Sequence, residues 1–174
     1  LQYERQPLFS IPYLTGERYC GAGPFASGVF FGLRREHGSR DMIQAVMEGV
    51  VYSIRYIYEA LNENQITVSQ VKMGGGGASV KDWPQLFADI LGMPVEIPST
   101  IEMALVGNAI IAFTAGGEFD NIADAKNKLT GTGKIITPVD RHVKIHDQRF
   151  AFFKKLRQNM DILFEEHGTT AWLH

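Results

Sequence analysis

The sequence predicts a domain of the α/β class, and three neighbouring features carry the prediction. Residues 68–73 alternate apolar and polar side chains, as a half-buried strand does. The four glycines Gly74–Gly77 follow at once, and apolar side chains then recur at helical spacing from Trp83 to Leu91. A strand, a glycine turn and an amphipathic helix in succession are typical of α/β domains.

The glycine run is the first candidate site. Glycine has no β-carbon, so such a turn can take positive φ and let a ligand approach its backbone closely. A helix that starts after it presents unpaired N–H groups and a partial positive charge, both of which suit a phosphate. Tight packing or plain flexibility explains many other glycine runs. Because the glycine run lies between a strand and a helix, a nucleotide-phosphate turn and a purely structural turn are equally favoured.

Composition excludes several classes of protein. A chain of 174 residues is one domain or a large part of one. The formal net charge of -2 gives no electrostatic reason to expect nucleic acid or acidic lipid as a partner. Apolar runs stay below the roughly 18 residues of a membrane span. Glu4 and Arg5 interrupt any signal-peptide core. We therefore expect no nucleic-acid or membrane partner.

Cysteine content and the first residue add two further expectations. The single cysteine, Cys20, excludes an internal disulfide and fits a reducing cytoplasm. A bystander thiol is favoured over a reactive one, because no flanking motif supports reactivity. The chain starts at Leu1 rather than methionine, which indicates a fragment of a longer polypeptide.

The first 38 residues are expected to be irregular, because prolines and glycines are frequent there. Two short apolar pieces stand out, residues 8–14 and residues 29–31. Glu17 and Arg18 lie between them and are candidates for ligand contact. A charge pair that holds the loop is the favoured interpretation.

Residues 40–63 form the clearest predicted helix, with one face apolar at steps of three and four. Ser39 is the expected N-cap, and Asp41 in the first turn suits the helix dipole. Glu48 lies among buried positions of this helix. A carboxylate bonded to a neighbouring backbone donor is favoured over a functional role.

Downstream, the helix after the glycine run is expected to end at Gly92, and residues 94–98 to form a short strand between prolines. A capping box from Ser99 to Glu102 predicts the start of the next helix. Gly107 lowers the stability of that helix by roughly 1 kcal/mol relative to alanine. A closely approaching backbone or ligand would explain the glycine, and chance is the alternative.

The last third of the chain is predicted to contain two helices joined by a loop. It should contain a helix at 122–129, a polar loop at 130–142 and a closing helix from Asp147, with a Phe and Leu stripe for packing. His142 and His146 are spaced i, i+4, but the residues between them look extended, which argues against a zinc pair. His174 ends the chain. Nucleophile-elbow, P-loop and HExxH motifs do not occur, and the glycine run lacks GxGxxG spacing. No metal site is expected.

Five stretches in this order resemble the C-terminal domain of the FGGY family of carbohydrate kinases, which includes xylulose, gluconate and glycerol kinases. They are residues 12–18 (PYLTGER), 28–33 (GVFFGL), 45–50 (AVMEGV), 75–92 (GGGASVKDWPQLFADILG) and 102–107 (EMALVG). Residues 75–92 are similar to the pattern GGGAxxxxWxQxxADxxG, and 102–107 to ExxALG with a one-residue shift. The likeness spans roughly residues 10–115.

The resemblance implies an actin-like, ribonuclease H-like ATPase domain. It would have a mixed sheet with flanking helices, be incomplete at its N-terminus, and be one of two lobes that close over sugar and ATP. By carry-over, Gly75, Gly76, Gly77 and Ala78 line the ATP phosphate and ribose, and Lys81 lies near the nucleotide. Relatives often place a small polar residue at position 81 and serine at Val80. Proline and tryptophan are common among relatives where residues 19–22 stand.

The implied chemistry is phosphoryl transfer from ATP to a sugar or sugar acid, a pentulose such as xylulose or gluconate. An aspartate accepts the sugar hydroxyl proton while Mg²⁺ and backbone donors steady the γ-phosphate. The family's catalytic aspartate and sugar-binding N-terminal lobe lie upstream of the matched stretches. We therefore expect no catalytic residue here, no turnover by these residues alone, and the N-terminal lobe as a partner; homodimers are common in the family. The alternatives are a non-catalytic nucleotide-binding or interaction module and, least favoured, a purely structural role.

Overall fold

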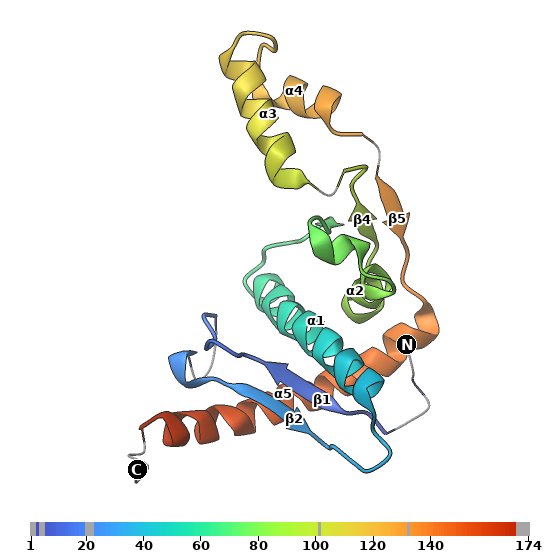
Figure 1. Ribbon diagram of the computed structural model, residues 1–174, viewed down its shortest axis with the longest axis vertical. Helices are drawn as coiled ribbons and strands as arrows, with labels where there is room; N and C mark the ends of the chain where they lie inside the picture. Colours follow the sequence, from blue (N-terminus) through green and yellow to red (C-terminus); the bar gives the residue numbers. More distant parts are fainter. Residues whose placement is uncertain (1–2, 4–5, 20–22, 101, 132, 170–174) are drawn as a thin grey trace. The chain divides into compact units, whose positions relative to one another are not determined.

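The computed structural model describes residues 3, 6–19, 23–100, 102–131 and 133–169. Cys20 and His174 lie outside the described residues. Figure 1 shows the chain as a ribbon coloured along the sequence. It divides into two compact units, one formed by Leu1–Val68 with Asp140–His174 and the other by Ser69–Val139. The second unit is therefore an insertion in the sequence of the first.

The first unit begins with an antiparallel hairpin, which the two apolar pieces of the N-terminal segment form. Strand β1 (Phe9–Pro12) pairs with β2 (Gly28–Phe31) in a register that sets Phe9 opposite Phe31. A short 3₁₀ helix, η1 (Gly23–Phe25), lies between the two strands in sequence. Ile11 of β1 is fully buried. The segment predicted to be irregular thus contains a sheet, although a small one.

Helix α1 (Ser39–Glu63) lies against β1, as Figure 1 shows. The predicted Ser39 N-cap is wrong by one residue. Gly38 is the N-cap, and its N–H donates to the Asp41 carboxylate over 2.8 Å, which ties down the first turn. Gly49 sits where the helix meets the strand, since an added β-carbon there would clash with the carbonyl oxygen of Ser10. Only glycine allows this close approach.

The closing helix, α5 (Asp140–Thr169), is longer than the sequence pattern predicts. The expected polar loop at 130–142 is wrong, because it contains strand β5 (Lys134–Ile136) and the first residues of α5. Residues 143–145 are helical rather than extended. The stripe of aromatic and leucine side chains is packed at Phe150, Phe153, Leu156 and Phe164, which are buried, but Leu163 of the predicted stripe is exposed.

The second unit holds a three-stranded mixed sheet in the order β3-β4-β5. Strand β3 (Val71–Lys72) runs parallel to β4 (Val95–Ile97), and β4 runs antiparallel to β5. Helix α2 (Trp83–Leu91) contacts β4 and β5 and ends, as predicted, at Gly92 in the left-handed conformation. The mixed sheet with flanking helices expected from the sequence is confirmed, with a β3 shorter than residues 68–73.

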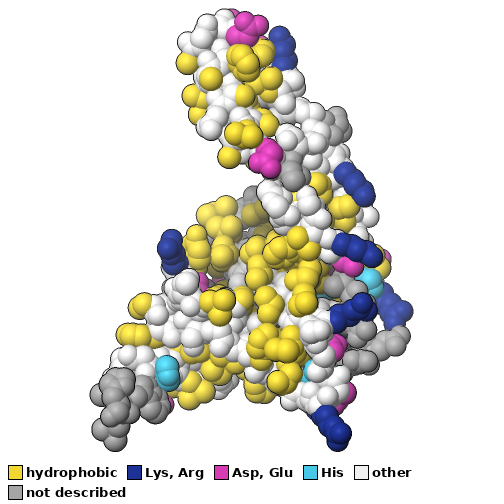
Figure 2. Space-filling view, in the orientation of Figure 1, with side chains coloured by type: hydrophobic (Ala, Val, Ile, Leu, Met, Phe, Trp, Pro, Cys, Tyr) yellow, Lys and Arg dark blue, Asp and Glu magenta, His cyan; other side chains and the backbone are white. Residues whose placement is uncertain are grey.

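Two further helices, α3 (Met103–Ala115) and α4 (Ile122–Leu129), pack on each other in the second unit. The capping box predicted at Ser99 is wrong. Helix α3 starts four residues later, with Glu102 as an N-cap that makes no side-chain cap bond. Gly107 faces open space, so no close backbone explains it. The hydrophobic side chains of α3 lie mostly at the surface of the unit, as Figure 2 shows.

Within the described part of the chain, none of the helices has the length and apolar character needed to cross a membrane.

Candidate functional site

The glycine turn connects β3 to a 3₁₀ helix, η2 (Gly76–Ser79). Gly75 precedes it at φ 73°, in the left-handed region that favours glycine. The turn is closed by its own hydrogen bonds, from the Ala78 amide to the Gly75 carbonyl at 3.0 Å and from the Val80 amide to the Gly77 carbonyl at 3.2 Å. Of the four glycines in the run, Gly75 alone has positive φ, so the special conformation predicted for the run is confined to one residue.

The surface of the turn is open at Gly75 and Gly76. A β-carbon added at either position would meet no atom within 4 Å. Gly77 differs, because its added β-carbon would lie 3.2 Å from the Met73 side chain and 3.4 Å from the Trp83 ring. Among the described residues, no hydrogen bond has the amide of Gly76 or Gly77 as its donor. The turn therefore combines bare backbone donors with room for a ligand.

The helix predicted from Trp83 is observed, but the glycine turn does not lead directly into it. Helix α2 starts at Trp83, and Asp82 is its N-cap at φ 66° with no side-chain cap bond. The α2 dipole therefore does not begin at the turn, and a phosphate there would depend on the amides of η2 itself. Lys81 lies between the two helices and is exposed. The structure brings residues 75–78 into one turn and leaves Lys81 three residues beyond its end.

A buried carboxylate links α2 to the segment after β5. Asp89 is fully buried, and its Oδ1 accepts hydrogen bonds from the Val139 amide at 2.8 Å and from Gln85 at 2.9 Å. Gln85 also donates to the Thr137 carbonyl. These contacts give the Gln and Asp of the WxQxxAD pattern a structural role in the second unit.

The PYLTGER loop of the first unit is held by a buried ion pair. Glu17 accepts from Arg157 of α5 at 3.1 Å and from the amide of Tyr19 at 2.7 Å. The guanidinium of Arg157, 2% exposed, also lies 4.5 Å from the ring of Tyr56. The predicted loop-holding charge pair exists, but the partner of Glu17 is Arg157, while Arg18 is exposed. Sequence spacing gave no signal of a partner 140 residues away.

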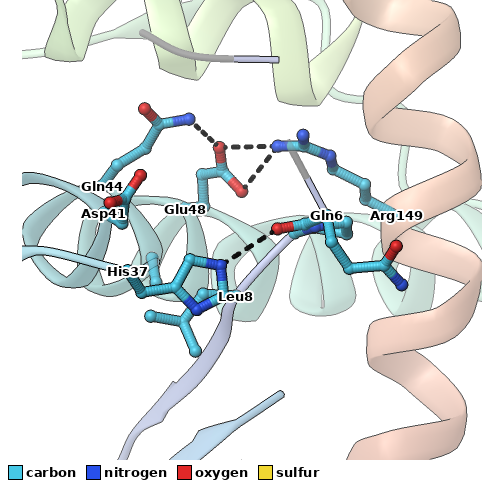
Figure 3. Close-up of a pocket in the computed structure, with 9 residues that line it drawn as sticks. Gln6, Leu8, His37, Asp41, Gln44, Glu48 and Arg149 are labelled. Carbon is cyan, nitrogen blue, oxygen red and sulfur yellow. Dashed lines mark hydrogen bonds and ion pairs between the residues drawn. The ribbon is translucent and has the colours of Figure 1, made fainter. Parts of the chain in front are cut away.

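A second buried ion pair joins α1 to α5 (Figure 3). Glu48 receives hydrogen bonds from Arg149 at 3.0 and 3.2 Å and from Gln44 at 2.7 Å. Burial raises the pKa of Glu48, and the nearby Arg149 charge opposes that shift. The carboxylate is buried as predicted, but its partners are side chains and not a backbone donor. His37 and Asp41 line a small pocket beside the pair.

The neighbouring polar cluster centres on His146 of α5, which is fully buried. Its Nδ1 is hydrogen-bonded to the Tyr52 hydroxyl at 2.8 Å, and its Nε2 to the Tyr3 hydroxyl at 3.2 Å. Burial lowers the pKa of His146 to about 3, helped by the charges of Arg149, His142 and Arg55. The helix does align His142 with His146, but Tyr3 packs against both rings.

Among the described residues, no group of three or more His, Cys, Asp or Glu side chains could hold a metal ion.

Comparison with known proteins identifies the class of protein. Residues 1–116 match the C-terminal domain of the FGGY family of carbohydrate kinases. The chain belongs to this family.

The individual relatives that match this chain are carbohydrate kinases by name. A gluconokinase of Bacillus subtilis is 31% identical over 86% of this chain and 29% of its own length. A xylulose kinase of Escherichia coli is 28% identical over 92% of this chain and 32% of its own length. The crystal structure of xylulose kinase from Rhodospirillum rubrum superposes with a TM-score of 0.76 at 28% identity, covering 90% of this chain and 31% of that one. The chain thus spans about a third of the length of these relatives.

Proposed function

We propose that this chain supplies part of the nucleotide site of an enzyme that phosphorylates a sugar or sugar acid with ATP, with xylulose and gluconate as the leading substrates. Membership of the FGGY family supports the reaction class. The names of the relatives, a gluconokinase and a xylulose kinase, support the substrates. The proposed fold is the actin-like, ribonuclease H-like ATPase domain, incomplete at its N-terminus.

The observation that carries the proposal is the open glycine turn. Gly75, Gly76, Gly77 and Ala78 would line the α-phosphate and ribose of ATP, and Lys81 would lie near the nucleotide. Bare amides at Gly76 and Gly77 suit phosphate oxygens, which accept hydrogen bonds from backbone donors. Space above Gly76 lets a bulky anion reach them.

The chemistry requires groups from outside these residues. In-line phosphoryl transfer needs a base for the sugar hydroxyl and Mg²⁺ to neutralise the phosphates. We propose that the catalytic aspartate and the sugar-binding lobe belong to a part of the polypeptide beyond these 174 residues. We also propose that the enzyme is cytoplasmic. On this proposal the chain alone does not turn over any sugar.

The exposed apolar side chains of helix α3 favour the presence of another part of the polypeptide, such as that lobe, that covers this helix. Its thirteen residues, MALVGNAIIAFTA, carry no charge, yet Ile110 is the one residue of the helix that is buried. Leu105, Ile111 and Phe113 are 65%, 62% and 48% exposed. A helix that is apolar on all sides is normally buried, so we propose that the remainder of the polypeptide covers α3.

The test is a pair of matched valine substitutions in the polypeptide that includes the proposed N-terminal lobe. Gly76→Val adds a side chain where the structure has open space, so the fold should persist while ATP binding weakens by at least about tenfold, the loss expected for one charge-assisted hydrogen bond. Asn62→Val, at an exposed position near the end of α1, is the control and should leave ATP binding unchanged. Calorimetric titration with Mg-ATP measures both. Equal ATP affinities in the two variants would refute a nucleotide at the turn.

A second candidate is a non-catalytic nucleotide-binding module derived from the same lobe. The unusual residues Val80 and Lys81 beside the turn favour it. Binding of ATP without phosphorylation of xylulose or gluconate by the longer polypeptide would select this alternative.

A further inference from the structure

The first unit contains a pocket whose lining residues are not among those proposed for the nucleotide. It has a volume of about 280 Å³ and lies between the PYLTGER loop and α1. The loop contributes a cation, a hydroxyl and an aromatic ring, and the helix contributes a hydroxyl and two aliphatic side chains. These residues are Thr15, Arg18, Tyr19, Ser53, Ile54 and Ile57.

The loop side of the pocket is rigidly built. Gly16 has φ 81°, and a β-carbon there would lie 3.1 Å from the carbonyl of Gly23. The amide of Glu17 donates to that same carbonyl at 2.8 Å, and its carboxylate bonds to buried Arg157. A charged pair buried to this degree is costly unless its geometry is well satisfied. The pair fixes the backbone from which the next two side chains project.

The charges around the pocket do not balance. Glu17 is neutralised by Arg157, with which it forms an ion pair at 3.1 Å. Arg18 is exposed and forms no ion pair with any residue in the described part of the chain. The lining therefore carries one uncompensated positive charge. A guanidinium in this state prefers a phosphate or carboxylate, to which it donates two parallel hydrogen bonds.

The remaining lining suits a polyhydroxylated molecule. Ser53 donates its hydroxyl hydrogen to the Gly49 carbonyl at 2.9 Å, so its lone pairs can accept from a ligand hydroxyl. Thr15 supplies a second hydroxyl. The ring of Tyr19, 75% exposed, and the side chains of Ile54 and Ile57 offer apolar surface for the C–H faces of a sugar. The volume lies near the lower end of the range for small-molecule sites.

We propose that this pocket binds a phosphorylated sugar, with Arg18 on the phosphate and Thr15 and Ser53 on the sugar hydroxyls. The choice of a sugar phosphate rests on the proposed function, because such a molecule is the product of a sugar kinase. Binding at this pocket would let the level of the product regulate the enzyme.

The experiment compares Arg18→Gln with Arg35→Gln, an equally charge-removing change at an exposed arginine in the β2–α1 loop. Titration calorimetry without ATP uses three probes, D-xylulose 5-phosphate, D-xylulose and inorganic phosphate. We expect saturable binding of the sugar phosphate by the unmodified protein. Arg18→Gln should weaken it by at least about tenfold, the loss of a charge-assisted hydrogen bond, and Arg35→Gln should leave it unchanged.

Three results would overturn the inference: no saturable binding, equal effects of the two arginine variants, or inorganic phosphate binding as tightly as the sugar phosphate. Gly76→Val separates this inference from the proposed function. Loss of both ATP and sugar-phosphate binding in that variant would locate the phosphate at the glycine turn and refute the pocket alone. Loss of ATP binding with the sugar phosphate retained would support both. Failure of the unmodified protein to bind ATP, with Arg18-dependent binding of the sugar phosphate intact, would refute the nucleotide site and support the pocket.

Discussion

Replacing His146 by glutamine should change the pH dependence of stability in a defined direction. The imidazole is neutral in the folded protein, because burial and three nearby cationic groups lower its pKa from 6.5 to about 3. In the neutral ring one nitrogen donates and the other accepts, so the hydroxyls of Tyr52 and Tyr3 take complementary roles. Glutamine keeps a donor and an acceptor but does not titrate.

The magnitude follows from linkage. Since the folded pKa lies below the unfolded one, the unfolded state binds the proton first as pH falls. The stability due to the neutral ring is therefore complete above pH 6.5 and is lost progressively toward pH 3. Each pH unit in this window is worth about 1.4 kcal/mol, so on the order of 2–3 kcal/mol disappears between pH 6.5 and 4.5. Glu48 acts in the opposite sense, since its raised pKa makes the folded state retain a proton above pH 4.5.

The assay is urea unfolding of both proteins at pH 7 and pH 4.5, followed by circular dichroism. The difference in unfolding free energy between the original protein and His146→Gln cancels the contribution of Glu48. We expect the variant to be less stable at pH 7, and the gap to shrink by on the order of 2–3 kcal/mol at pH 4.5. A gap that is the same at both pH values would show that His146 does not stay neutral, and the reasoning would fail.

Two further substitutions test the packing of the first unit. Gly49→Ala should lower the unfolding free energy by about 1–3 kcal/mol, because the new methyl group clashes with the Ser10 carbonyl; an unchanged melting curve would contradict the close approach of α1 to β1. Glu48→Leu should cost about 3–5 kcal/mol by leaving Arg149 buried without its partner, and the double variant with Arg149→Met should recover most of that loss in urea unfolding. If the double variant were as unstable as the single one, the ion pair would not be the cause.

Local patterns were enough to predict the helices with a regular apolar stripe. The long helix α1 was placed to within one residue at its start, and α2 was bounded correctly by Gly92, because both depend on periodicity and capping close in sequence. The fold class followed from the strand, turn and helix around the glycine run. Residues 75–78 are a candidate site on the strength of the same run, and they remain a proposal; the positive φ of the run is confined to Gly75.

The start of α5 could not be predicted, for a physical reason. Its first turns bury His146 and Arg149 rather than apolar side chains. Their partners Tyr52 and Glu48 lie about a hundred residues earlier in the chain, at separations of 94 and 101. A polar face that is satisfied by distant side chains has the sequence signature of a loop. Long-range pairing likewise explains why Glu17 was matched with its neighbour Arg18 and not with Arg157.

The order of the two units along the chain has a consequence for synthesis on the ribosome. Residues 1–68 emerge first, but Glu17 and Glu48 wait for Arg157 and Arg149, which are made last. Until then, both acids must stay hydrated, so the hairpin and α1 cannot bury them. The segment Ser69–Val139, by contrast, has its sheet and helices complete as soon as it leaves the exit tunnel. Of these two units, the one inserted in the sequence of the other is therefore able to fold first.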